Sequence, residues 1–90
     1  NATIIVLDIQ GKETSSEALA SRIERYTVEG VSHLVFVIGG SDGLTNAVKE
    51  RASLRMSFGP ITLPHNLARV VLLEQVYRAF KIIKREPYHK

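Results

Sequence analysis

Two strand-like runs separated by one amphipathic helix are the pattern that most constrains the fold of this 90-residue chain. Residues 3–9 and 33–38 are almost continuously β-branched or aliphatic, which is typical of parallel strands covered on both faces. The stretch "QGKE" at residues 10–13 is expected to end the first strand. Parallel strands need a crossover, and a helix in that crossover makes a βαβ unit. The sequence therefore predicts an α/β fold.

The predicted crossover helix has a beginning and an end that the sequence marks. Thr14 stands three residues before Glu17, the spacing at which two side chains cap the first turn reciprocally. Gly30 is expected to close the helix, because glycine favours the left-handed conformation that follows a last turn. Between these positions one apolar face recurs at helical spacing. Its members are Leu19, Ile23 and Tyr26.

The second half of the chain predicts three more elements. Residues 44–52 favour a short helix with Thr45 as its cap, and residues 54–58 alternate like a third strand. A long helix is expected from His65 to about Lys84. No internal repeat or linker interrupts residues 1–90, so we predict a single domain.

The long helix is apolar over more than half of its circumference, so it must be covered on more than one side. Two arrangements satisfy this requirement. The helix is threaded deep within its own fold, or it packs on a sheet with one side and on a second subunit with the other. The second is favoured in a chain this short, whose core is small, and it predicts a homodimer. The apolar positions are Leu67, Val70, Val71, Leu73, Val76, Tyr77, Phe80 and Ile83.

Composition excludes several classes of protein. The absence of cysteine rules out disulfides and thiolate metal sites and favours a reducing compartment, which is compatible with the expected cytoplasmic location. Three histidines without ligand spacing give no support for a metal. No apolar run approaches the ~20 residues that cross a membrane. A net charge of +3 permits a polyanionic partner without requiring one.

Two loops are candidate ligand contacts. "VIGGSDGL" places glycines just after a buried strand, where open α/β sheets bind ligands, although its spacing fits neither a dinucleotide fold nor a phosphate-binding P-loop. Its alternative is a plain turn. In "SFGPITLPH", glycine and two prolines restrict a loop whose backbone groups suit an adenine edge. Its alternative is an ordinary connector.

Polar residues near the carboxyl terminus have open interpretations. His65 suits substrate positioning or a structural hydrogen bond. Arg69 and Arg78 lie nine residues apart, on opposite sides of an ideal helix, and should have different surroundings. Tyr88 and His89, among basic residues, suit stacking on an unpaired base beside phosphates, or else belong to a solvated tail.

Several motifs, in order along the chain, give a closer indication. They are "LDIQGK", "SSEALA", "FVIGG", "DGL", "MSF", "TLPH", "RVVLLEQVYRAFKI" and "EPYHK". Together they resemble the RlmH family of SPOUT-class ribosomal RNA methyltransferases over practically the whole chain. The resemblance implies a homodimer with a carboxyl-terminal trefoil knot that binds S-adenosylmethionine. It also implies methylation of N3 of a pseudouridine in 23S rRNA of the large ribosomal subunit.

The resemblance also assigns site residues by motif. Substrate binding falls to His65 and Arg69, and catalysis to Arg78, Tyr88 and His89, with His89 as the base. The expected cofactor contacts, made largely through backbone groups, are Leu7, Gly39, Phe58, Gly59, Pro60, Ile61, Thr62 and Leu63.

The chain departs from the family's pattern in two places. "FGP" stands where family members usually carry a serine-containing run, and the family's first strand and following helices have no counterpart. We therefore expect the carboxyl-terminal part or a trimmed core of a longer enzyme, with the cofactor cleft but without full activity on ribosomes. The alternatives are an RNA-binding module that needs no cofactor and a purely structural knotted dimer.

Overall fold

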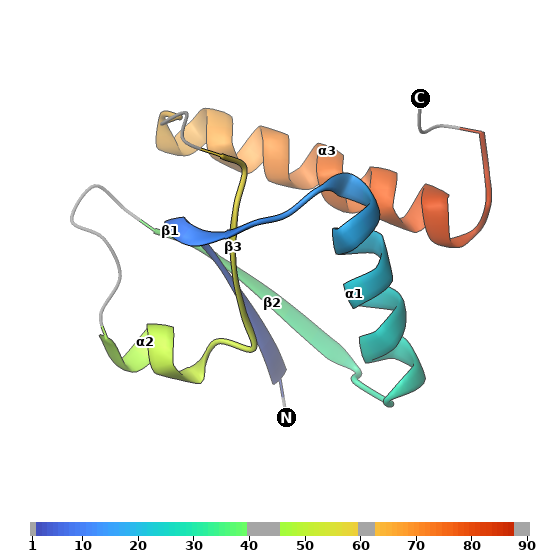
Figure 1. Ribbon diagram of the computed structural model, residues 1–90, viewed down its shortest axis with the longest axis horizontal. Helices are drawn as coiled ribbons and strands as arrows, with labels where there is room; N and C mark the ends of the chain where they lie inside the picture. The colour runs from blue at the N-terminus through green and yellow to red at the C-terminus, as the bar shows by residue number, and fades with distance from the viewer. Residues whose placement is uncertain (1, 40–45, 60–62, 88–90) are drawn as a thin grey trace.

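A three-stranded parallel sheet forms the centre of the protein (Figure 1). The computed structural model describes residues 2–39, 46–59 and 63–87. Its strands are β1 (Ala2–Glu13), β2 (His33–Ile38) and β3 (Leu54–Ser57), in the order β2-β1-β3. Both neighbours pair with β1 in parallel, so the predicted α/β fold with a parallel sheet is confirmed. The predicted knot depends on connections that lie partly outside these ranges, and it stays a prediction.

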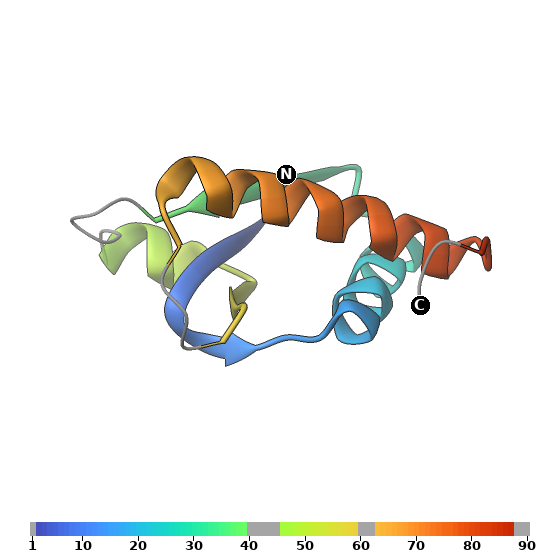
Figure 2. The same cartoon turned by 90° about the horizontal axis from the view of Figure 1, so that it is seen from above.

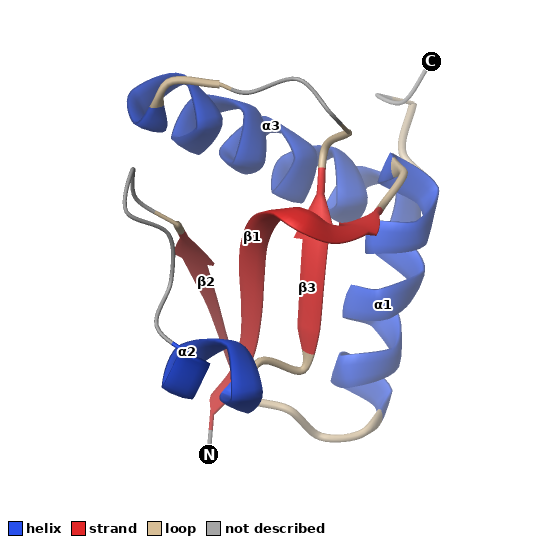
Figure 3. Cartoon of the chain, turned by 60° about the vertical axis from the view of Figure 1, so that its left-hand side comes forward, coloured by secondary structure: helices blue, strands red, loops and turns tan. Residues whose placement is uncertain are grey.

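Helices cover both faces of the sheet (Figure 3). The connection from β1 to β2 and the one from β2 across β1 to β3 run in opposite directions along the sheet. Right-handed crossovers therefore place α1 (Ser16–Val28) and α2 (Asn46–Arg51) on opposite faces. The third helix, α3 (His65–Ile83), lies on the side of α1, and the two helices meet toward the carboxyl end of α3 (Figures 1 and 2). There the Ser16 hydroxyl donates to the Gln75 side-chain oxygen.

The core fills the space between the sheet, α1 and α3. Ile5 of the central strand is fully buried and lies opposite Phe36 and Leu54. The apolar face predicted for the first helix points into this core, as expected. The buried members of the cluster are Ile5, Leu19, Ala20, Ile23, Tyr26, Leu54, Met56 and Ala79.

The beginning of α1 differs from the predicted capping box by one residue. The N-cap is Ser15, whose hydroxyl accepts the Ala18 N–H at 3.0 Å. The Thr14 hydroxyl instead donates to the Lys12 carbonyl at 2.9 Å. The capping prediction at Thr14 was therefore wrong, because β1 continues almost to this point. Gly30, at φ 85°, follows the helix end as predicted.

The first strand is longer than predicted and contains a bulge. Leu7 and Lys12 both lie opposite Met56, so residues 8–11 leave the ladder before the strand rejoins β3 at Lys12. The prediction that residues 10–13 end the strand was wrong, because four extra residues are absorbed in the bulge. Gly11 makes this possible: a β carbon at this position would lie 2.6 Å from the Arg55 carbonyl oxygen.

The long helix begins and ends within one residue of its predicted limits. Ala68, Leu72 and Ala79 are buried, so one side of α3 is covered by its own chain. A second apolar side is exposed in the single chain, at Leu67, Val70, Leu73, Tyr77 and Phe80. Despite this apolarity, none of the helices in the described ranges is long and apolar enough to cross a membrane.

The close approach at Gly11 predicts a local steric penalty. Gly11→Ala should lower the free energy of unfolding by about 2 kcal/mol, because the new methyl group must push the β3 backbone away. Denaturant unfolding measures the loss. The control is Gln10→Ala, an exposed neighbour in the same bulge that should change stability little. Equal effects of the two substitutions would contradict the steric account.

Candidate functional site

The carboxyl ends of the paired strands lie side by side at one end of the sheet, which we call the carboxyl edge. Leu7 lies opposite Ile38 of β2 and Met56 of β3. Just beyond this row, the Gly39 N–H donates to the Leu7 carbonyl over 3.4 Å. Ligands of open parallel sheets bind outside the carboxyl ends of the strands. This edge is therefore the candidate binding site.

Backbone groups dominate the described part of this edge. The side chains of Leu7 and Phe58 are partly buried and pack against the hydrophobic core. Gly39 and Gly59 have no side chain to cover the peptide groups beside them. A ligand at this edge would therefore meet mainly backbone and apolar surface, with few polar side chains.

The exit from β3 is a tight turn built by Ser57. Its buried hydroxyl donates to the Gly59 carbonyl at 3.1 Å and accepts the Gly59 N–H at 3.0 Å. Gly59 has φ 110°, a conformation that other residues rarely adopt. The Ser57 carbonyl accepts the Thr14 N–H at 3.0 Å, which ties the turn to the end of β1. The position of Gly59 is therefore fixed from two strands.

A charged cluster lies directly behind Leu7. The Asp8 Oδ2 atom accepts hydrogen bonds from Nη2 and Nε of Arg55, at 2.9 and 3.3 Å. The Lys49 Nζ atom of α2 lies 3.9 Å from the same oxygen. The other oxygen, Oδ1, accepts the Gln10 N–H at 3.0 Å. One carboxylate thus joins β1, β3 and α2.

Asp8 keeps its negative charge in this environment. The pKa of its carboxyl is lowered chiefly by the hydrogen bond from the Gln10 N–H. The Arg55 hydrogen bond and the positive charges of Lys49 and Arg55 add to this effect, whereas burial opposes it. Only 10% of the Asp8 side chain is exposed, whereas the Arg55 side chain is 40% exposed, so solvent screens this ion pair from the arginine side.

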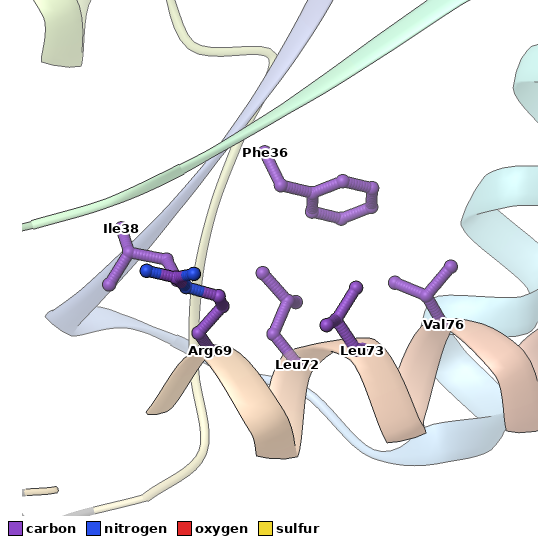
Figure 4. Close-up of a pocket in the computed structure, with 6 residues that line it drawn as sticks. All are labelled: Phe36, Ile38, Arg69, Leu72, Leu73 and Val76. Carbon is purple, nitrogen blue, oxygen red and sulfur yellow. The ribbon is translucent and has the colours of Figure 1, made fainter. Parts of the chain in front are cut away.

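The residues assigned to substrate lie at the beginning of α3. His65 is its first residue, and its side chain lies outside the described part of the structure. Arg69 is exposed and borders an apolar cavity of about 400 Å³ between β2 and α3 (Figure 4). The other lining residues are Phe36, Ile38, Leu72, Leu73 and Val76.

The residues assigned to catalysis are described only in part. Arg78 donates to Glu74 Oε2 from Nη2 at 2.8 Å and from Nε at 3.1 Å. Its surroundings differ from those of Arg69, as predicted from their spacing. Tyr88 and His89 lie outside the described residues.

A further ion pair lies at the end of α3, where the pKa of Lys81 is raised chiefly by its hydrogen bond to Glu86.

The cofactor contacts expected in the proline loop are also incompletely described. Phe58 and Gly59 lie at the edge, and Leu63 is partly buried just before α3. Pro60, Ile61 and Thr62 lie outside the described ranges. Within those ranges, no three histidine or acidic side chains gather where they could hold a metal ion.

Two polar residues of this edge were missed from the sequence. Asp8 was not predicted as a site residue, although a carboxylate within an apolar run needs partners. Ser57 was not singled out, although a serine two residues before a glycine is a known turn former. Those two signals were local and could have been used.

Comparison with known proteins identifies the family. A family model described as "Predicted SPOUT methyltransferase" matches residues 1–89. The chain belongs to this methyltransferase family. It is 54% identical over 87 residues to a Leuconostoc mesenteroides protein named "Ribosomal RNA large subunit methyltransferase H", covering 97% of this chain and 55% of that protein.

Other relatives carry the same name. A Bifidobacterium animalis protein is 55% identical over 89 residues, and one from Listeria monocytogenes is 53% identical over 90 residues. These matches cover 99% and 100% of this chain, and 56% and 57% of the relatives. They confirm the resemblance to the RlmH family. The SPOUT chain thus spans little more than half the length of these curated relatives.

Proposed function

We propose that this SPOUT chain binds S-adenosylmethionine at the carboxyl edge of its sheet, as the donor-binding core of a ribosomal RNA methyltransferase. The observation that carries the proposal is the convergence of Leu7, Gly39 and the Gly59 turn on that edge. Backbone N–H and C=O groups at this edge could pair with an adenine ring, which carries donors and acceptors on one planar rim. The names of the relatives support the methyltransferase class.

The proposed substrate is N3 of a pseudouridine in 23S rRNA of the large ribosomal subunit. S-adenosylmethionine supplies an electrophilic methyl group when it is bound. The protein must hold the nucleotide so that N3 approaches that group in line, and this positioning accounts for much of the rate. His65 and Arg69 are proposed to hold the RNA from the beginning of α3. The net charge of +3 is compatible with such a polyanionic partner.

Proton removal is the second requirement of the reaction. N3–H of pseudouridine must lose its proton before or as the nitrogen attacks. We assign removal of this proton to His89. Arg78 is assigned to stabilise the negative charge that develops on the pseudouridine ring, and Tyr88 to contact the nucleotide. The Arg78 guanidinium is held by Glu74, which fixes its direction on α3. Because the proposed substrate is part of the ribosome, the proposed location is the cytoplasm.

A homodimer is part of the proposal. The exposed side of α3 carries five large apolar residues at spacings of three and four, as on one continuous helix face. A second copy of the chain that packs there would remove this surface from water. A trefoil knot in the connections around α3 belongs to the same proposal.

Calorimetric titration with S-adenosylhomocysteine tests donor binding. We expect one site per chain, with a dissociation constant between roughly 1 μM and 1 mM, the range typical of enzyme ligands. Gly59→Ala should weaken binding, because φ 110° must change and the turn with it.

The matched control for this titration is Gly30→Ala. Gly30 also has positive φ but lies at the end of α1, so its substitution should leave affinity unchanged. Absence of binding to the wild-type chain would contradict the proposed function. RNA binding without any heat from the ligand would instead favour an RNA-binding module, and a dimer that binds neither would favour a structural role.

The dimer proposal predicts a mutation with no cost to the single chain. Val70 is 60% exposed, so Val70→Lys should leave the fold of one chain intact but place a charge in the interface. Light scattering after size exclusion should give a dimer for the wild type and a monomer for the variant. Val28→Lys, at an 82% exposed position on α1, should remain a dimer. A monomeric wild type at micromolar concentration would refute the proposal.

A further inference from the structure

The bulge of β1 is anchored to β3 at both of its ends. At its beginning, the Asp8 carboxylate accepts two hydrogen bonds from the Arg55 guanidinium. At its end, the Gly11 backbone lies so close to the Arg55 carbonyl that no β carbon would fit. One residue of β3 therefore contacts the bulge through its side chain and through its backbone.

This anchor lies close in sequence to two parts of the candidate site. Asp8 follows Leu7, whose carbonyl accepts the Gly39 N–H. Arg55 lies two residues before Ser57, whose hydroxyl forms the turn at Gly59. The Asp8–Arg55 ion pair thus links the residue after Leu7 to the strand that leads into the Gly59 turn.

Stability alone does not account for a charge at this position. Asp8 is 90% buried, and removing a carboxylate from water costs free energy that a salt bridge often only repays. An apolar residue of similar size would suit the end of a buried strand at least as well. The carboxylate instead orients its neighbours, because Arg55, Lys49 and the Gln10 N–H all interact with its two oxygens.

We propose that Asp8, through Arg55 and Lys49, is a positioning residue that sets the geometry of the methyl-donor site. Its assignment to donor binding rests on the proposed function. The carboxylate does not touch the donor. It holds β1 and β3 in place where they lead into the Leu7 carbonyl and the Gly59 turn.

Asp8→Asn tests this role with little change in shape. Asparagine retains an oxygen for the Gln10 N–H but loses the charge that attracts Arg55 and Lys49. We expect amide hydrogen exchange at Gly39 and Gly59 to become about tenfold faster, while the amides of α1 keep their protection. Affinity for S-adenosylhomocysteine should fall about tenfold, the loss of one charge-assisted hydrogen bond.

Two further variants separate positioning from a general effect of charge. Glu29→Gln makes the same change in net charge at the exposed Arg25–Glu29 pair and should alter neither exchange nor affinity. Arg55→Gln should reproduce the effects of Asp8→Asn. The double variant should lose little more than either single one, because the two residues act as a unit.

The outcomes distinguish this inference from the proposed function. Unchanged exchange at Gly39 and Gly59 in Asp8→Asn would overturn the positioning role, and so would an equal rise in exchange throughout α1. A wild-type chain that binds no S-adenosylhomocysteine would remove the proposed function, and the exchange rates would still decide whether Asp8 sets the geometry of the edge.

Discussion

Parallel pairing of β2 and β3 with the same central strand is the constraint on which the rest of the structure depends. It brings Ile38 and Met56 to the level of Leu7, although these residues are far apart in sequence. Because both crossovers have the same hand, the helices that connect the strands lie on opposite faces and leave the edge between them. The candidate binding edge is thus a consequence of topology, and individual side chains refine it.

The bulge in β1 shows how that refinement is achieved. A continuous strand would pair Asp8 with Ser57, whereas residues 8–11 leave the ladder and pairing resumes with Lys12 at Met56. Gly11 supplies the space and Asp8 supplies the charge. The same segment then reaches the Ser57 carbonyl through the Thr14 N–H. Strand continuity and site geometry are therefore coupled through a few neighbouring residues.

The sequence predicted what depends on local pattern. The apolar runs located β2 to the residue, and the apolar face of α1 and both limits of α3 followed from helical spacing. The extension of β1 to Glu13 and the cap at Ser15 were not predicted, because "QGKE" is a turn-forming stretch whose strand pairing is decided by β3, more than 40 residues away. The ion pair of Asp8 with Arg55 could not be predicted for the same reason, since strand register sets it. The donor and substrate assignments came from the resemblance and not from periodicity.

Two apolar surfaces of α3 have different relations to this edge. The buried one joins the helix to α1 and the sheet, and the exposed one is the proposed contact with a second copy. The central claim is that the methyl donor lies against the strand ends. A crystal structure of the chain with S-adenosylhomocysteine tests it most directly. The account predicts the adenine within hydrogen-bond distance of the backbone at Leu7, Gly39 or the Gly59 turn. Ligand found instead in the cavity between β2 and α3, away from those residues, would contradict it.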